Sequence, residues 1–333
     1  MPLVTAVVPV YNHEKYVIES VRSILRQTYR NIELIIINDG SGDRSHEMVL
    51  TLVEECKKRF IHFEYLNREN RGLAATLNQA LRIARGKYFS VLASDDIALP
   101  NKVSLLVDAL ESANDTCAAA FGNALFIDSE GEEVRLDSKG CIAANAGSIS
   151  YDNFIDFYTR DRSFDYRGNE FGTYKTLIVA NYLPAMSNLV RTAAISEAGG
   201  WTVGNVIEDW EMWLKLSKKY RFIYINKPLA FYRLHDNSST SLMSYRLNLC
   251  SLLLLAKEKK YCKENDLIAC WSSAYVSLLS PVLLDKRVAL SEKVSFLDYS
   301  EISYVSFYFA KKIARKALKM MRTLERMLQE RPR

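Results

Sequence analysis

The chain has 333 residues, of which 49% are hydrophobic and 25% charged. This is the composition of a soluble globular protein with room for one large domain and an appendage, or for two domains. The net charge of +5 is uneven, because residues 311–333 hold nine Lys or Arg and two Glu, which leaves residues 1–310 at −2. The six cysteines contain no CxxC pair, which argues against a cysteine-based metal site and indicates reduced thiols in a cytosolic protein.

Two apolar stretches resemble targeting or membrane segments. Leu3–Val10 is too short for a signal peptide and no basic region precedes it, so we expect none. Leu267–Leu284 has no charged residue, but four serines and Pro281 dilute it. A buried helix is therefore favoured over a membrane span.

The first hundred residues alternate strands and helices. Leu3–Val10 predicts a strand, the spacing of Val17, Val21 and Ile24 predicts a helix, and Ile32–Ile37 predicts a second buried strand. Such a βαβ unit implies parallel pairing and a right-handed crossover. The alternation continues with a helix, a strand, a helix and a strand at residues 45–57, 62–66, 72–84 and 88–92.

Two consecutive carboxylates, Asp95 and Asp96, follow the strand at 88–92. Open α/β sheets bind ligands at the carboxyl ends of their strands. Adjacent carboxylates repel each other unless a cation or a hydrogen-bond donor compensates, so we interpret the pair as a site for a divalent metal and a diphosphate. The alternative is that both residues cap a helix that begins at Pro100.

Two more polar segments follow strand ends. Asp39 is placed to accept a hydrogen bond from a ligand at the sheet edge, although an Asx-turn or a helix cap fits it equally well. Arg71 opens a helix, where a positive charge is unfavourable. Arg71 either binds an anionic ligand or is a solvated surface charge.

The second hundred residues mix helices, strands and aromatic residues. Tyr151–Tyr174 holds eight aromatic side chains among charged ones, which suits a sugar or lipid-linked acceptor, although a contribution to the core is the commoner role. The turn at Asp128–Gly131 predicts a hairpin. We expect helices at 103–111 and 191–198 and strands at 117–127, 133–136 and 222–225.

A carboxylate and a histidine in this half are candidates for chemistry. A helix that starts near Glu208 places Asp209 on one face with Trp213, where desolvation would raise its pKa and suit a general base. Its alternative role is to complement the helix dipole. His235 follows a predicted strand at 229–234 and is either a hydrogen-bonded structural residue or an additional metal ligand.

Beyond Ser241 the chain is expected to be helical, over residues 242–261, 267–284, 289–297 and 302–328. The last of these helices is basic and amphipathic. Binding to an anionic bilayer is the physical use of such a helix.

Taken together, six motifs occur in the order and spacing of the inverting family 2 glycosyltransferases, which the chain resembles over residues 3–240. They are PVYN at 9–12, NDGSGD at 38–43, NRGLAATLNQAL at 70–81, ASDDIALP at 93–100, EDWEMW at 208–213 and YRLHDNSS at 232–239. The resemblance implies the GT-A fold, an α/β nucleotide-binding sandwich with a mostly parallel mixed sheet, here with a C-terminal helical extension.

The same resemblance implies a division of the chain. Residues 1–240 would form the glycosyltransferase domain, in which residues 1–100 bind the nucleotide sugar and residues 101–240 make the acceptor and catalytic half. Residues 241–333 would form the helical extension with its basic tail.

Donor-site roles also follow from the resemblance. Tyr11 and Asp39 would contact the nucleobase, Asp39 at its imide nitrogen, and Arg71 would help to hold the nucleotide. The other residues assigned to the donor site are Pro9, Ser94, Asp95 and Asp96.

The resemblance implies catalytic and metal roles as well. Asp95 would carry Mn²⁺ or Mg²⁺ on the donor diphosphate, and His235 matches a histidine that completes the metal site in some members. Asp209 would deprotonate the acceptor hydroxyl. The family often has an Asp two positions before the metal carboxylate, where this chain has Ala93, so the ribose contacts and the choice of donor stay open.

The leading hypothesis is a metal-dependent inverting hexosyltransferase that moves a sugar from a UDP-sugar to a hydroxyl of a glycan or of a polyprenyl-diphosphate-linked glycan, as in bacterial surface polysaccharide assembly. One base suffices for a single in-line displacement, and inversion follows. We expect a cytoplasmic protein, peripheral on the inner face of the cell membrane, with no nucleic-acid partner; a homo-oligomer stays open.

Two alternatives belong to other functional classes. A sugar-phosphate nucleotidyltransferase would need a glycine-rich phosphate loop after the first strand, which PVYNHEKY does not supply. A non-catalytic membrane or nucleic-acid adaptor would use the basic tail.

Overall fold

The structure, a computed structural model, describes residues 1–143, 149–236 and 244–284. Contacts between Cα atoms divide the chain into two compact units, with the boundary between Met243 and Ser244. We describe each unit by itself.

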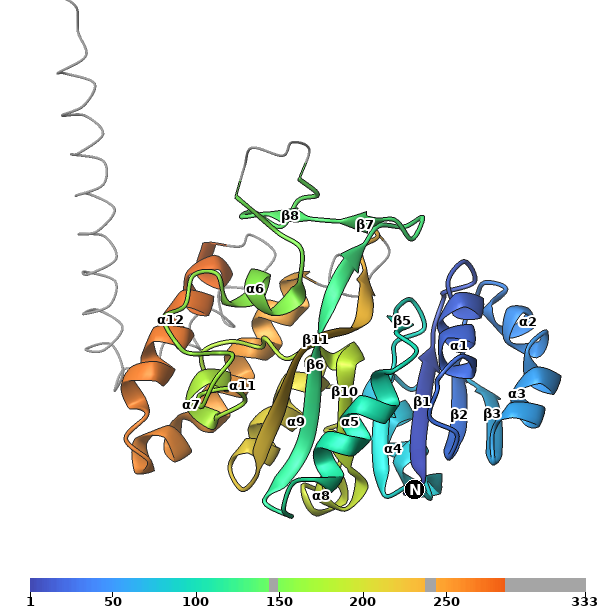
Figure 1. Cartoon of the computed structure of the whole chain (residues 1–333). Helices are drawn as coiled ribbons and strands as arrows, with labels where there is room; N and C mark the ends of the chain where they lie inside the picture. The colour runs from blue at the N-terminus through green and yellow to red at the C-terminus, as the bar shows by residue number, and fades with distance from the viewer. Residues whose placement is uncertain (144–148, 237–243, 285–333) are drawn as a thin grey trace, which may run out of the picture. The chain divides into compact units, whose positions relative to one another are not determined.

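The first unit is built on a mixed sheet (Figure 1). Among the described residues this sheet has nine strands in the order β3-β2-β1-β4-β10-β6-β11-β5, with β7 paired to β6. A separate small sheet consists of β8 and β9. The strands are β1 Val4–Val10, β2 Ile32–Asp39, β3 His62–Arg68, β4 Tyr88–Val91, β5 Ile97–Ala98, β6 Cys117–Ile127, β7 Glu133–Val134, β8 Leu136–Asp137, β9 Ser150–Tyr151, β10 Asn188–Arg191 and β11 Arg221–Arg233.

Strand direction fixes where the functional residues gather. Strands β3, β2, β1 and β4 pair in parallel. Strand β10 is antiparallel to both β4 and β6, and β11 is parallel to β6. It follows that β1, β2, β3, β4, β6 and β11 all point the same way, and their carboxyl ends share one edge of the sheet.

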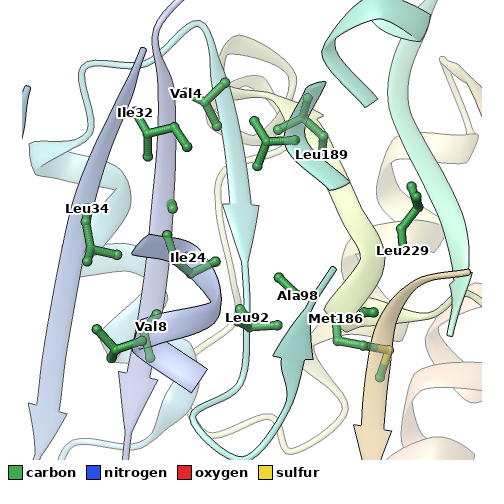
Figure 2. Close-up of a cluster of buried hydrophobic side chains, with 14 of the residues drawn as sticks. Val4, Val8, Ile24, Ile32, Leu34, Leu92, Ala98, Met186, Leu189 and Leu229 are labelled. Carbon is green, nitrogen blue, oxygen red and sulfur yellow. The ribbon is translucent and has the colours of Figure 1, made fainter. Parts of the chain in front are cut away.

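Helices cover both faces of this sheet. Val4, Val8, Ile32 and Leu34 point to one face, and Figure 2 shows their side chains with Ile24 of α1 among them. The alternate residues of β1 and β2 are buried too, because α4 packs against both strands from the other face. The helices of this unit are α1 Val17–Leu25, α2 Ser45–Leu50, α3 Val53–Arg59, α4 Leu73–Ile83, α5 Lys102–Glu111, α6 Phe154–Thr159, α7 Tyr174–Leu177, the 3-10 turn η1 Ala185–Ser187, α8 Thr192–Glu197 and α9 Glu208–Ser217.

The predicted α/β class with a mixed, mostly parallel sheet is confirmed, and the predicted hairpin exists as β6 and β7. Three details of the prediction were wrong. Strands β5 and β10 were missed, because two and four residues are too few to show a two-residue period. The expected helix at 45–57 is two helices, and the expected strands around Pro228 are one strand with register shifts at that proline.

The aromatic segment Tyr151–Tyr174 contributes mainly to the core. Phe154 and Phe157 are buried and pack with Phe126 of β6, while Phe171 packs with Phe121. Of the two predicted roles of this segment, a contribution to the core therefore accounts for these rings.

The second unit is described over two helices, α11 Ser244–Glu264 and α12 Ile268–Leu284, which pack against each other. The indole N–H of Trp271 donates to the carbonyl of Leu255 at 2.6 Å, which ties the two helices together. No helix among the described residues is long and apolar enough to span a bilayer. The expected helices at 289–297 and 302–328 lie outside the described residues.

Candidate active site

Three side chains meet beyond the carboxyl ends of three strands. His13 follows β1 by three residues, Asp95 follows β4 by four, and His235 follows β11 by two. Asp95 Oδ2 lies 3.0 Å from His235 Nε2 and 3.7 Å from His13 Nε2. The ligand atoms of all three residues lie within 4.8 Å of one another. This is the donor set and the spacing of a divalent metal site.

Burial and charge in this cluster favour metal binding. Only 13% of the Asp95 side chain and 4% of the His235 side chain are exposed. Burial alone would raise the pKa of Asp95, but the hydrogen bond from His235 and the charges of His13 and His235 hold it below its ordinary value. Burial lowers the pKa of His13, which favours the neutral imidazole that metal binding requires.

The segment after β4 is held in place by a buried arginine. Arg233 donates from Nε to the carbonyl of Asp95, and its own backbone N–H donates to Asp96 Oδ1. Its other guanidinium nitrogens reach the carbonyl of Asp128 and the carboxylate of Glu19. One side chain thus joins the ends of β4, β6 and β11 to α1.

The alternative role of Asp95 and Asp96 as helix caps is wrong, because α5 begins at Lys102 with Asn101 at its N-cap. Asp96 is buried, and burial together with the charge of Asp95 raises its pKa well above the ordinary value. The Lys102 ammonium, also buried, donates to the carbonyl of Met186. The assignment of Asp96 to the donor site stays a prediction.

The residues assigned to the nucleotide lie at the same edge. Asp39 ends β2 and accepts hydrogen bonds at Oδ1 from Arg68 and from the backbone N–H of Arg71. The Arg71 side chain is exposed, and half of the Tyr11 surface is exposed beside the end of β1. Pro9, in β1, is partly buried.

Asp209 lies in the first turn of α9. Its Oδ2 accepts a hydrogen bond from Asn181 Nδ2 at 3.0 Å and its Oδ1 accepts one from the backbone N–H of Trp210. Burial raises the pKa of Asp209, and both hydrogen bonds oppose that shift. Burial and the charge of Asp209 raise the pKa of the neighbouring Glu208 to about 8. A carboxylate with a raised pKa is suited to accept a proton near neutral pH.

Asp209 belongs to the same edge of the sheet as Asp95. Three residues join α9 to the start of β11, and Trp213 of α9 packs on Phe121 and Phe222, so the helix runs back along the strands. Its first turn therefore lies toward their carboxyl ends.

Comparison with known proteins identifies the family. Residues 5–176, more than half of the chain, match the model described as glycosyl transferase family 2. The chain belongs to glycosyltransferase family 2. An uncharacterized glycosyltransferase of Haemophilus influenzae is 28% identical over 74% of this chain and 70% of its own length. One from Rickettsia bellii is 37% identical over 41% of this chain, and the match spans only 20% of that protein.

Solved structures support the fold. A mannosyltransferase of Pyrobaculum calidifontis, solved with GDP-Man and Mn²⁺, has a TM-score of 0.59 at 17% identity and covers 98% of this chain and 84% of its own. TarS 1–349 of S. aureus, solved with UDP-GlcNAc, has a TM-score of 0.59 at 16% identity over 91% and 81%. The predicted GT-A fold of this family 2 protein is confirmed.

Four residues of the candidate site escaped the sequence reasoning: His13, Asn181, Arg68 and Arg233. His13 alone left a usable signal, since it follows a central parallel strand at nearly the same distance as Asp95 follows its own strand. The other three are recognisable only by their partners, which lie 28, 29 and as many as 214 residues away along the chain.

Proposed function

We propose that this family 2 protein is a divalent-metal-dependent, inverting glycosyltransferase that moves a hexosyl group from a UDP-sugar to a hydroxyl of a glycan or lipid-linked glycan. The carrying observation is that His13, Asp95 and His235 cluster at the sheet edge to which Asp209 also belongs. Metal binding and proton abstraction need those two kinds of group within reach of one bound donor.

The residues present fit a divalent ion. His13, Asp95 and His235 offer two imidazole nitrogens and one carboxylate, partly screened from solvent. The chemistry that such an ion supplies is neutralisation of the negative charge that develops on a departing diphosphate.

Asp209 is the proposed base. It takes the proton of the acceptor hydroxyl as that oxygen bonds to the anomeric carbon, and the bond from this carbon to the diphosphate oxygen breaks, which releases UDP. A single displacement of this kind inverts the anomeric configuration. Asn181 holds the carboxylate through Nδ2 and, among the described residues, its buried Oδ1 has no partner. That oxygen can accept a hydrogen bond from a sugar hydroxyl.

The loops after β1, β2 and β3 would bind the donor. Asp39 would accept the imide N–H of uracil, while Tyr11 and Arg71 contact the base and the nucleotide, and Pro9, Ser94 and Asp96 support the same site. The donors in the structural relatives, GDP-Man and UDP-GlcNAc, are those proteins' own. We propose UDP for this chain because Asp39 would accept the imide N–H of uracil.

The acceptor and the cellular location are also part of the proposal. A polyprenyl-diphosphate-linked glycan suits an enzyme of surface polysaccharide assembly at the cytoplasmic face of the membrane. The basic segment 311–333 would hold the protein there through anionic lipids, which its sequence alone supports.

Two variants and a ligand panel test the function. Asp209→Asn should bind UDP-sugar with nearly unchanged affinity. Its kcat should fall roughly 10²–10⁴-fold, since general-base catalysis contributes a factor of that size. Asp95→Ala should remove the effect of Mn²⁺ on the thermal shift produced by a UDP-sugar. Donors carrying UDP, GDP and dTDP, each with and without Mn²⁺, identify the base. Equal loss of binding and transfer in Asp209→Asn would make Asp209 a structural residue instead.

A further inference from the structure

We propose that His13 is a direct ligand of the metal ion, and that the resulting set of two imidazoles and one carboxylate makes the site select transition-metal ions such as Mn²⁺ and Co²⁺ over Mg²⁺. This inference rests on the proposed function, because it concerns the same site. It assigns a residue and a class of ion that the sequence motifs leave open.

The two distances from Asp95 suit a shared ion. Ligand atoms about 2.1 Å from one ion lie roughly 3–4 Å from each other when they occupy adjacent or splayed positions. Asp95 Oδ2 is 3.0 Å from His235 Nε2 and 3.7 Å from His13 Nε2. An ion placed among these three atoms would keep open positions for phosphate oxygens and water.

His13 is oriented as a metal-binding histidine is. Its Nδ1 lies 2.8 Å from Ser94 Oγ, so that Nδ1–H can donate to the hydroxyl and leave the lone pair on Nε2, the nitrogen that faces Asp95. Its backbone N–H donates to Ser45 Oγ at 2.9 Å, which fixes the loop. Hydrogen bonds that hold the far nitrogen and the main chain are the usual support of a histidine ligand.

The ring is confined from the other side as well. The imidazoles of His13 and His235 meet edge to face at 5.7 Å, and the Tyr16 ring contacts both. Two imidazoles and one carboxylate are thus turned toward one point. They are what a cation with nitrogen ligands requires.

The residue two positions before Asp95 offers no side-chain ligand. Residue 93 is alanine and has no donor atom in its side chain. Its carbonyl oxygen already accepts hydrogen bonds from the Ser20 hydroxyl and the Asp96 backbone N–H. His13 reaches the site from the loop after the neighbouring strand β1 and offers a nitrogen ligand there.

Metal preference follows from the ligand types. Mg²⁺ prefers oxygen ligands and keeps most of its waters, whereas imidazole suits first-row transition ions and raises affinity along the series from Mn²⁺ to Co²⁺. With two nitrogens in a set of three, Mg²⁺ should bind more weakly than Mn²⁺.

The test is metal binding by the full-length protein in the presence of UDP. Free Mn²⁺ is measured by its electron paramagnetic resonance signal, and Co²⁺ and Mg²⁺ by competition with Mn²⁺. His13→Ala should weaken Mn²⁺ binding by about tenfold or more. His13→Asp should restore Mn²⁺ binding, because it supplies a carboxylate oxygen as ligand. It should also reduce the difference in affinity between Mn²⁺ and Mg²⁺. His46→Ala is the matched control, because His46 contacts Tyr65 and not the cluster.

The outcomes separate the inference from the function. Unchanged Mn²⁺ affinity in His13→Ala, with binding abolished in Asp95→Ala, would overturn the role of His13 and leave the proposed function standing. Unchanged affinity in both variants would overturn the metal site itself. If His13→Ala fails to fold, as judged by its melting curve, His13→Gln keeps the side-chain volume and answers the same question.

Discussion

At the scale of single residues, the properties of Asp209 come from its neighbours. Burial raises its pKa, whereas the donated hydrogen bonds from Asn181 and from the Trp210 backbone favour its charged form. Glu208 adds a second carboxyl group beside it, with a pKa of about 8. The two carboxyls interact, so the pH dependence of transfer reports the pair and not either residue alone.

We expect two variants to have different effects on this pH dependence. A base works when deprotonated, so kcat/KM rises with pH through the apparent pKa. Asn181→Ala removes a donor that favours the charged carboxylate, which raises this pKa and moves the acid limb to higher pH. Glu208→Gln replaces a carboxyl group that is neutral below its pKa of about 8 with a neutral amide, so it should leave this limb in place. The measurement is kcat/KM against pH at saturating metal, and a purely structural Asn181 would lower the rate without moving the limb.

At the scale of elements, β11 connects the site to the sheet. Its last residue, Arg233, is 1% exposed at the side chain and donates to groups that follow β4 and β6 and to Glu19 of α1. The guanidinium also lies over the Tyr16 ring at 4.9 Å. Because His235 lies two residues further along, the same anchor fixes the histidine relative to Asp95.

Arg233→Met tests this anchor. Removing a buried, fully hydrogen-bonded charge leaves its partners unpaired and should lower the free energy of unfolding by roughly 3–5 kcal/mol. Urea denaturation measures the loss, and Mn²⁺ binding should weaken as the Asp95 loop relaxes. Arg221→Met, at the exposed start of the same strand, is the control and should stay within about 0.5 kcal/mol of the parent. If both variants lowered the free energy of unfolding equally, Arg233 would not be the anchor of the Asp95 loop.

At the scale of the whole molecule, charge is separated along the chain. Residues 1–310 carry −2 and residues 311–333 carry +7. An anionic bilayer attracts each basic residue near its surface by about 1 kcal/mol, an interaction that salt screens. Residues 1–310 by themselves would be weakly repelled by the same surface.

Deleting residues 311–333 should release the protein from vesicles that contain anionic lipid at moderate salt. Flotation of full-length and truncated protein with anionic and with zwitterionic vesicles measures this, and transfer to a soluble acceptor should be unchanged. A truncated protein that still floats with anionic vesicles would show that another part of the chain binds the membrane.

The sequence by itself determined the α/β class, the parallel half of the sheet and the residues that follow its strands. Alternating apolar runs and helical spacing are local signals, and Asp39, Asp95 and His235 each follow such a run. Family 2 membership was also readable, since six short motifs keep their order and spacing.

Only the tertiary structure decided which of these residues meet. Strand β10, four residues long, reverses direction between β4 and β6 and so brings β11 and His235 to the edge where β4 ends. The pairing of His13 with Asp95, of Asn181 with Asp209 and of Arg233 with the Asp95 carbonyl depends on contacts across 82, 28 and 138 residues. No local sequence pattern encodes such pairs, because the two residues of each pair meet only when the strands and helices that carry them pack together.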